Sequence, residues 1–332
     1  MPSKSSTVAG TSTSASKPPY GIRDVVAGTS STGFGRLRSA PASLAKILEK
    51  ELAPEIIGQD PFQVRKVRDS LWRLTDYHGP TGLTLLAIAA IDVALRDLMR
   101  HVMGQPVWRL LGAARDRMPT YAMVGWLNFS VDELEPIAEK AMAQGFTGVN
   151  MKVGCATLDK DVARITAVRS IVGHDRRLMV DANQVFDVSE AIRRGRVYQE
   201  LECFWFEEPL RADNHAHLAK LRSTLDVRIA SGGNDFGKRQ FRDRFEHRVV
   251  DIVQPDIKRA GGATECREIA AMADAFEVVH ASHGGGPHLH LLDAMPNANY
   301  TESGFLPDGA TLEDGCLLMP EGPRFCKPAW GH

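Results

Sequence analysis

The stretch Phe206-Glu207-Glu208-Pro209 decides the fold, because it reads as the end of a short apolar strand followed by acids. Two other stretches have the same form: Asp181-Ala182-Asn183 follows Leu178-Met179-Val180, and Gln254-Pro255-Asp256 follows Ile252-Val253. A longer segment with helical periodicity comes after each of them. An apolar run of strand length, an acidic end and then a helix are typical of a βα unit. In a closed barrel of parallel strands, the ends of such units meet on one face, where catalytic groups collect.

The spacing of these strand ends separates two fold classes. Polar residues and one glycine recur at intervals of 19 (from 283 to 302) to 29 (from 152 to 181) positions, in the order Lys152, Asp181, Glu207, Gly233, Asp256, His283 and Glu302. A strand, a helix and two short loops need roughly 25–30 residues, so each interval accommodates one βα unit. A doubly wound open sheet gathers ligands at one switch point and not around a ring. The sequence therefore predicts a (β/α)8-type barrel.

Length and composition exclude several classes of protein. The chain has 332 residues, enough for a barrel of about 250 residues and a smaller domain. Its net charge of −1 gives no electrostatic footprint for nucleic acid, and no apolar run approaches the ~18–20 residues that cross a membrane. The cysteines lack disulfide or metal-type spacing, which predicts a reduced, cytoplasmic protein. They are Cys155, Cys203, Cys266, Cys316 and Cys326.

The order of segments predicts three parts. Residues 1–19 are rich in Ser and Thr and predict a disordered tail; a transit peptide is the alternative, but no amphipathic face is present. Residues 20–115 form the predicted α+β capping domain, of which 20–36 are the remnant of a small sheet and 41–112 are helical. Residues 116–328 form the predicted barrel domain, with a helix at 131–144 that ends before Gly145.

In this order and at these intervals, the strand-end residues resemble the mandelate racemase subgroup of the enolase superfamily. The residues that carry the resemblance are Lys152, Asp181, Asn183, Glu207, Asp256, His283 and Glu302. Enolase-superfamily sites combine a Lys or His base with Mg²⁺, which stabilises an ene-diolate. The resemblance covers residues 20–328 and implies an N-terminal cap, a Mg²⁺ cofactor, a small-molecule carboxylate substrate and a homo-oligomer. The sequence preceding Gly33-Phe34-Gly35 is too short for the complete first strand and loop of such a cap.

The resemblance implies the catalytic residues. Lys152 and His283 are expected to exchange a proton with the substrate, and Asp256 to hold one imidazole nitrogen and so fix its tautomer. His280 is the rival histidine, but the interval of 27 residues from position 256 to 283 favours His283. Glu302 is expected to bind the substrate carboxylate as that group gains charge.

The resemblance also implies a metal site. Asp181 and Glu207 are the expected ligands, since Mg²⁺ prefers carboxylate and other oxygen ligands. The family pattern has Gly-Glu at 232–233, whereas this chain has Gly233 followed by Asn234 and Asp235. We expect Asn234 to supply the third ligand, with Asp235 as the alternative, because glycines bend strands and obscure which side chain faces inward.

Two asparagines are expected to contact the substrate, Asn150 and Asn183. Asn150 stands where the family pattern has the first lysine of a Lys-x-Lys pair. Lys152 therefore lacks one neighbouring cation that would help to lower its pKa from about 10.4 to the 7–8 that a base at neutral pH needs.

The resemblance implies an enzyme that abstracts the proton α to a carboxylate. Because most relatives of this kind look like sugar-acid dehydratases, it favours a hydro-lyase that dehydrates a sugar acid or other hydroxy acid. Racemisation or epimerisation of a 2-hydroxy acid by Lys152 and His283 is the alternative within the enzyme class. A non-catalytic binding protein derived from such an enzyme is a further alternative, favoured by the shortened cap and by Gly233.

Overall fold

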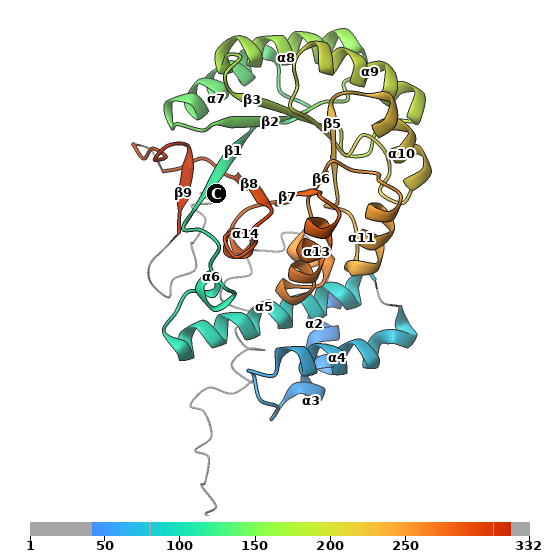
Figure 1. Cartoon of the computed structure of the whole chain (residues 1–332), viewed down its shortest axis with the longest axis vertical. Helices are drawn as coiled ribbons and strands as arrows, with labels where there is room; N and C mark the ends of the chain where they lie inside the picture. Colours follow the sequence, from blue (N-terminus) through green and yellow to red (C-terminus); the bar gives the residue numbers. More distant parts are fainter. Residues whose placement is uncertain (1–41, 80, 308, 320–332) are drawn as a thin grey trace, which may run out of the picture.

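A computed structural model describes residues 42–79, 81–307 and 309–319 of the chain (Figure 1). The predicted tail at 1–19 and the predicted sheet remnant at 20–36 lie outside the described residues, as does residue 328. The predicted domain boundaries therefore stay predictions.

Eight parallel strands close into a barrel. Their hydrogen-bonded order runs from β2 through β8 to β1, and β1 pairs again with β2, so that the ring closes. This closure confirms the predicted barrel and excludes an open sheet. A ninth strand, β9 (Cys316–Leu318), which we did not predict, runs antiparallel to β1. The barrel strands are β1 (Arg117–Gly125), β2 (Gly148–Lys152), β3 (Arg177–Asp181), β4 (Trp205–Glu207), β5 (Arg228–Ser231), β6 (Ile252–Val253), β7 (Val279–Ala281) and β8 (Ala298–Ser303).

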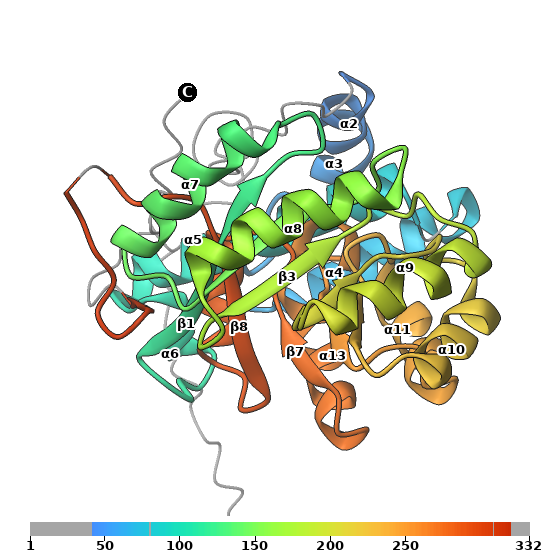
Figure 2. The same cartoon turned by 90° about the horizontal axis from the view of Figure 1, so that it is seen from above.

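Helices follow the strands along the outside of the barrel (Figure 2). The predicted helix at 131–144 corresponds to α7, where Ser130 and Glu133 form a capping box and Gly145 takes a left-handed φ of 84° after the last turn. The helices of this layer are α7 (Val131–Ala143), α8 (Leu158–Val172), α9 (Val188–Glu200), α10 (His215–Thr224), α11 (Gly237–Glu246), α12 (Ile257–Ala260), α13 (Ala263–Ala275) and α14 (Pro287–Leu292).

The barrel interior is filled by one set of side chains from the strands. Tyr121 and Trp205 are its largest members; both are fully buried, and their rings meet edge to face at 5.3 Å. Burying such a side chain contributes roughly 2 kcal/mol. The interior is therefore a packed core, and the polar strand ends stand above it. The cluster consists of Tyr121, Met179, Trp205, Ala230, Ile252, Ala281 and Tyr300.

A second layer of helices precedes the barrel in the sequence. In Figure 1, α5 lies between the barrel and the shorter helices, and it packs against both α4 and α12. Its length follows from an Ala- and Leu-rich sequence, and it ends at Gly104, whose φ is 63°. The elements are α2 (Ala42–Lys46), the π-helix η1 (Ile47–Leu52), α3 (Ala53–Ile56), α4 (Val64–Thr75), the 3-10 helix η2 (Asp76–His78), α5 (Leu83–Met103) and α6 (Val107–Leu110).

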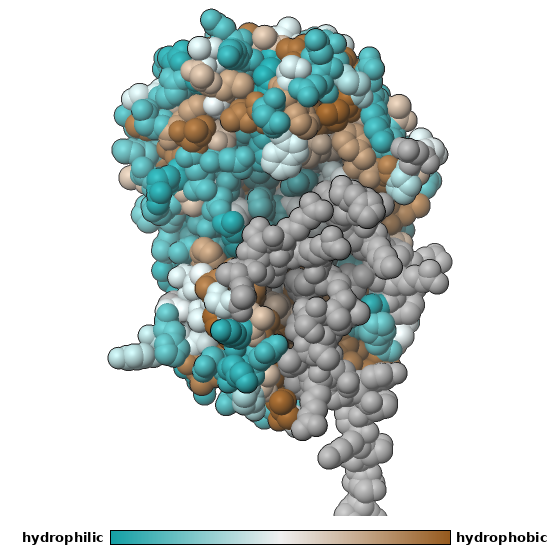
Figure 3. All heavy atoms as spheres, turned by 180° about the vertical axis from the view of Figure 1, so that it is seen from behind, coloured by the Kyte–Doolittle hydropathy of each residue, from teal (hydrophilic) through white to brown (hydrophobic). Residues whose placement is uncertain are grey.

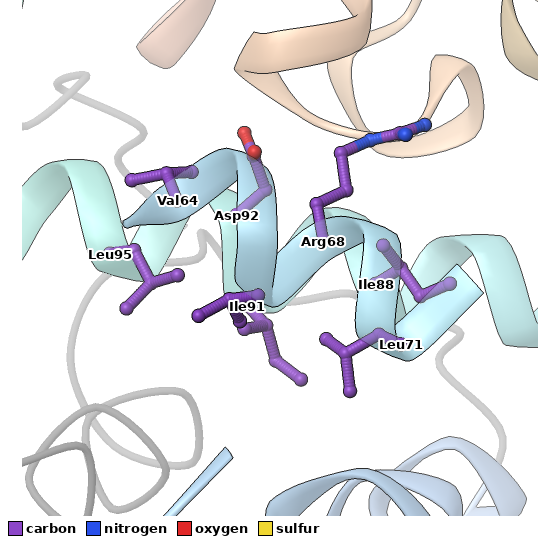
Figure 4. A pocket seen from close by; sticks show the side chains of 8 residues that line it. Val64, Arg68, Leu71, Ile88, Ile91, Asp92 and Leu95 are labelled. Carbon is purple, nitrogen blue, oxygen red and sulfur yellow. The ribbon is translucent and has the colours of Figure 1, made fainter. Parts of the chain in front are cut away.

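Two buried polar contacts join this layer to the barrel. Arg68 on α4 forms an ion pair with Glu265, and the carboxylate of Asp92 on α5 accepts hydrogen bonds from the backbone N–H and the hydroxyl of Thr264. Both side chains point away from the apolar residues between α4 and α5, such as Leu71 (Figure 4). The gap between those apolar residues has no room for a water molecule, so we assign it no function.

Outside the grey residues, the face seen in Figure 3 carries hydrophobic and hydrophilic residues side by side. Among the described residues, no helix has both the length and the apolar character needed to span a bilayer.

We expect Asp92→Ala to lower the free energy of unfolding by about 2–3 kcal/mol, because it leaves two buried donors of Thr264 without an acceptor. Asp69→Ala is the control: its side chain is 46% exposed, and the change should stay below about 0.5 kcal/mol. Urea denaturation measures both. Equal effects of the two changes would show that Asp92 does not join the layers.

Candidate active site

Three neighbouring strands end in the predicted polar residues. Lys152, Asp181 and Glu207 are the last residues of β2, β3 and β4. The strand register pairs Lys152 with Asp181 and Asp181 with Glu207. All three are at least nine-tenths buried. The predicted assembly of these residues at one end of the barrel is therefore present in the structure.

Lys152 forms a buried ion pair with Asp181. Its ammonium also lies 5.6 Å from the centre of the Trp126 ring, which comes from the loop after β1. Burial lowers the pKa of Lys152, but the charge and the hydrogen bond of Asp181 outweigh it, so the pKa is raised above its ordinary value. While Asp181 is paired with Lys152, this pKa is therefore not lowered to the value of about 7–8 that a base at neutral pH needs.

An arginine that the sequence did not single out fixes the loops around Lys152. Arg164 on α8 donates to the carbonyl of Lys152 at 2.8 Å and to the carbonyl of Trp126 at 2.7 Å. On the same helix, Asp161 accepts hydrogen bonds from the backbone N–H groups of Gly154 and Cys155. These contacts orient the strand end that carries Lys152. No sequence motif distinguishes Arg164 from the other helix arginines.

Glu207 is held by two donors on one carboxylate oxygen. Asn150 Nδ2 donates to Oε2 at 2.9 Å, and Trp205 Nε1 donates to the same atom at 3.1 Å. Burial raises the pKa of Glu207 to about 8, and the negative charge of Asp181 adds to this effect. Two negative charges this close together and largely shielded from solvent would repel each other, which favours the protonated form of Glu207.

Asn183 supports the other carboxylate. Its backbone N–H donates to Asp181 Oδ1 at 2.8 Å, and its side-chain amide donates to Oδ2 at 3.3 Å. The backbone of Asn183 has a φ of 45°, which asparagine tolerates better than most residues. The side chain is exposed at the barrel mouth. The substrate contact predicted for Asn183 and Asn150 stays a prediction.

His283 and Asp256 form the predicted pair. His283 Nδ1 lies 3.1 Å from Asp256 Oδ2, while Asp256 Oδ1 accepts hydrogen bonds from two backbone N–H groups at the start of α12. Burial lowers the pKa of His283, but the hydrogen bond and charge of Asp256 raise it to about 9. Burial raises the pKa of Asp256, but His283 and the neighbouring cations hold it well below its usual range.

The competing histidines lie in different surroundings. His280 belongs to β7 and is buried, and this burial lowers its pKa to about 3. His288 is buried as well, and its Nε2 accepts the backbone N–H of Ile257 at 2.8 Å. Among the described residues, neither has a hydrogen-bonded carboxylate partner of the kind that Asp256 provides to His283. The geometry therefore favours His283 over His280 as a proton donor or acceptor.

Glu302 stands on β8 as predicted. One of its carboxylate oxygens accepts the backbone N–H of Gly284 at 3.0 Å, which ties β8 to the residue that follows His283. The role of Glu302 towards a substrate stays a prediction.

The residues expected to replace the missing third ligand point elsewhere. Asn234 Nδ2 donates to both oxygens of Glu208 at 2.8 Å, and its Oδ1 accepts a hydrogen bond from Arg259. The amide oxygen that we expected on a metal therefore faces a cation already. Asp235 is buried against Arg244, with 2.7 Å between Oδ2 and Nε. This arrangement does not support our choice of Asn234, or of Asp235, as a metal ligand.

Several buried polar atoms inside the barrel have no hydrogen-bond partner among the described residues. They include the hydroxyl of Tyr121, Oδ1 of Asn150, the hydroxyl of Ser231 and the amide of Gln254. Tyr121 is paired with Glu302 in the strand register, and its pKa is raised by burial and then by the charges of Glu302, Glu207 and Asp181. Tyr121 is a site residue that sequence analysis missed, because it reads there only as an apolar strand residue.

The donor set fits a divalent cation held by two carboxylates. Within residues 42–79, 81–307 and 309–319, no group of three or more His, Cys, Asp or Glu side chains is arranged to hold a metal ion. Mg²⁺ often binds through only one or two carboxylates and completes its shell with water and substrate oxygens. A cation at Asp181 and Glu207 would relieve the repulsion that raises the pKa of Glu207. Asp181 and Glu207 could therefore hold a cation, and their assignment as metal ligands stays a prediction.

Comparisons with known proteins agree with this arrangement. Residues 133–323 match the family model described as Enolase C-terminal domain-like, and residues 8–112 match the one described as Mandelate racemase / muconate lactonizing enzyme, N-terminal domain.

Individual relatives are enzymes that act on sugar acids. A 3,6-anhydro-alpha-L-galactonate cycloisomerase from Streptomyces coelicolor is 31% identical, over 88% of this chain and 84% of its own. An L-talarate/galactarate dehydratase from Salmonella typhimurium is 33% identical, over 81% of this chain and 68% of its own. The crystal structure of an L-talarate dehydratase from Polaromonas sp. JS666, complexed with Mg and L-glucarate, superimposes with a TM-score of 0.80 at 33% identity, over 86% of this chain and 82% of that chain.

The pair formed by His283 and Asp256 predicts a pH-dependent stability. The pKa of His283 is about 9 in the folded chain, above the ~6.5 of an unfolded histidine. Because His283 binds its proton more tightly in the folded chain than in the unfolded chain, this proton stabilises the fold. The stabilisation is complete below about pH 6.5 and is lost as the pH rises through about 9. Because the side chain is 35% exposed, we discount the effect for solvent screening to about 1 kcal/mol.

We therefore expect His283→Gln, in the presence of a chelator, to destabilise the protein by about 1 kcal/mol more at about pH 6 than at about pH 10. Urea denaturation across this range measures the difference. His78→Gln, at an exposed histidine outside the barrel mouth, is the control. A loss for His283→Gln that does not change with pH would contradict the interaction with Asp256.

Proposed function

We propose that this chain is an Mg²⁺-dependent enzyme that acts on a carboxylate substrate. The chain belongs to the mandelate racemase/muconate lactonizing enzyme family of the enolase superfamily. It removes the proton α to the carboxylate of a hydroxy acid and expels the β-hydroxyl as water. The observation that carries the proposal is the presence of two proton-transfer groups, Lys152 and the pair of His283 with Asp256, around one pair of buried carboxylates.

The protonation states of His283 and Lys152 support different roles for them, as acid and as base. With a pKa of about 9, His283 is protonated at neutral pH and suits the role of the acid that donates a proton to the leaving hydroxyl. Lys152 suits the role of the base, but only once Asp181 no longer holds its ammonium. Bound Mg²⁺ supplies positive charge at Asp181 and Glu207 and at the carboxylate of the substrate.

The reaction balances with these groups alone. Lys152 Nζ takes the α-proton, and the electron pair of the broken C–H bond forms a C=C bond as the bond to the β-hydroxyl breaks. His283 gives its proton to the hydroxyl, which leaves as water. Because the α-carbon of a sugar acid also carries a hydroxyl, the product is an enol, which becomes a 2-keto acid when the enol hydroxyl loses a proton and the β-carbon gains one. Glu302, held by the N–H of Gly284, supports the substrate carboxylate.

Sugar acids are the proposed substrate class. The support is the similarity to the L-talarate/galactarate dehydratase and to the L-talarate dehydratase complexed with L-glucarate. The similarity to the cycloisomerase favours a second candidate, in which the same groups transfer protons within a substrate and no water leaves.

We expect the protein to form 2-keto acid from at least one member of a sugar-acid panel when Mg²⁺ is present. In D₂O, Lys152→Ala should lose exchange of the α-proton in one stereochemical series, and His283→Asn should lose water elimination while α-proton exchange by Lys152 persists. His280→Asn is the matched control and should keep both activities if it folds. NMR of the substrate measures all three.

Each outcome of this experiment assigns a function. Exchange without water loss supports isomerisation, including racemisation or cycloisomerisation. Sugar-acid binding without any exchange supports a binding protein and contradicts the enzyme. Loss of activity in His280→Asn but not in His283→Asn would show that we have chosen the wrong histidine.

Mg²⁺ affinity should depend on two carboxylates. We expect Asp181→Asn and Glu207→Gln each to weaken Mg²⁺ binding at least about tenfold, or about 1.4 kcal/mol, because each removes half of the available anionic pair. Calorimetric titration with MgCl₂ measures the affinity. Asp175→Asn, at an exposed acid before β3, should leave it unchanged. Unaltered affinity in both site variants would remove Asp181 and Glu207 from the metal site.

A further inference from the structure

The imidazole of His283 lies against the backbone of Gly233. Gly233 follows β5, and His283 follows β7, so the contact bridges two units of the barrel. A Cβ atom added to Gly233 would stand 2.4 Å from Cδ2 of His283 and 2.8 Å from both Cγ and Nε2. Such distances are below any normal contact between carbon and a ring atom. The ring therefore occupies the space in which a side chain of residue 233 would begin.

The ring is also held from its other side. Nδ1 of His283 is hydrogen-bonded to Asp256 Oδ2. Oδ1 of Asp256 in turn accepts hydrogen bonds from the backbone N–H groups of Lys258 and Arg259, at N···O distances of 2.7 and 3.1 Å. The chain after His283 is fixed as well, because Gly284 N–H is bonded to Glu302. The imidazole cannot give way to a side chain at position 233 without losing Asp256.

The backbone does not explain the glycine at this position. The preceding Gly232 has a φ of 136°, which L-residues rarely adopt, but Gly233 is not among the residues with positive φ. An alanine at 233 would meet no comparable backbone strain. What glycine provides at 233 is the absence of a side chain.

We propose that Gly233 is a positioning residue for His283: its missing side chain admits the imidazole, and this placement keeps Nδ1 on Asp256. As a consequence, the imidazole of His283 lies at the end of β5 in this chain. His283 could not keep this position if residue 233 had an acidic side chain. The catalytic meaning of the placement rests on the proposed function, but the placement itself does not.

The first test uses Gly233→Ala and the NMR signals of ¹⁵N-labelled histidines. A ring proton bonded to a carboxylate resonates downfield of free imidazole signals, and His283→Asn identifies the signal of His283 by its loss. We expect Gly233→Ala to abolish this signal or move it towards the free position. The matched control is Gly195→Ala on α9: its added Cβ would stand 2.3 Å from Leu225 Cδ1, and its φ is not positive. It should leave the His283 signal unchanged.

The second test is a double-mutant cycle for stability. Overpacking a fixed group costs enough for Gly233→Ala to raise the unfolding equilibrium constant about tenfold. In the background of His283→Ala the obstructing ring is absent, so the same change should have less than about a twofold effect. Gly195→Ala should have the same effect in both backgrounds. Urea denaturation measures the four variants of each cycle.

The outcomes separate this inference from the proposed function, because neither readout needs a substrate. An unchanged His283 signal in Gly233→Ala, or an equal cost in both backgrounds, would overturn the positioning role. If Gly233→Ala fails to fold, the double variant with His283→Ala decides. A folded double variant supports the positioning role, and a double variant that also fails to fold overturns it. If both tests succeed while no sugar acid reacts, the positioning role stands and the proposed function falls.

Discussion

The site depends on two carboxylates that the barrel buries side by side. Strand register sets Asp181 next to Glu207, and burial shields them from most of the water that would screen their repulsion. The surrounding groups compensate in different ways: Lys152 pairs with one acid, whereas Asn150 and Trp205 donate to the other. The pKa of Glu207, about 8, shows that this compensation is incomplete. In the proposed function, a cation would take the place of the proton on Glu207 and balance the charges of both carboxylates.

The same charges set the order in which the groups can act. Lys152 cannot serve as a base while Asp181 stabilises its ammonium, and His283 is kept protonated by Asp256. Both proton-transfer groups are therefore charged in the structure described here, and a cation at the carboxylates would release only the lysine. Because the two groups have separate acidic partners, a change at Asp181 alters the pKa of Lys152 without acting directly on the bond between His283 and Asp256.

Sequence reasoning predicted the barrel and the strand-end residues because both depend on a repeated pattern. The apolar runs before Asp181 and Glu207 and the regular intervals fix which residues end the strands, and strand ends share one face. It did not predict Tyr121 or Arg164, whose roles arise from contacts across the barrel that leave no local signal. It also did not predict the contacts of Asn234, since the proximity of Arg259 and Glu208 to this amide follows only from the tertiary structure. The short strand β9 (Cys316–Leu318) was missed for the same reason, because its partner lies about 200 residues earlier.

The absence of a side chain at Gly233 affects how many anionic ligands the site can offer to a cation. With His283 against Gly233, and with Asn234 and Asp235 bound to arginines, the end of β5 offers no anionic ligand to the space beside Asp181 and Glu207. A cation held by only two carboxylates keeps more positive charge and more open positions than one held by three. Oxygens of the substrate would then fill positions that a third carboxylate would otherwise take. On the proposed function, cation and substrate therefore bind in a mutually dependent way, since each completes the site of the other.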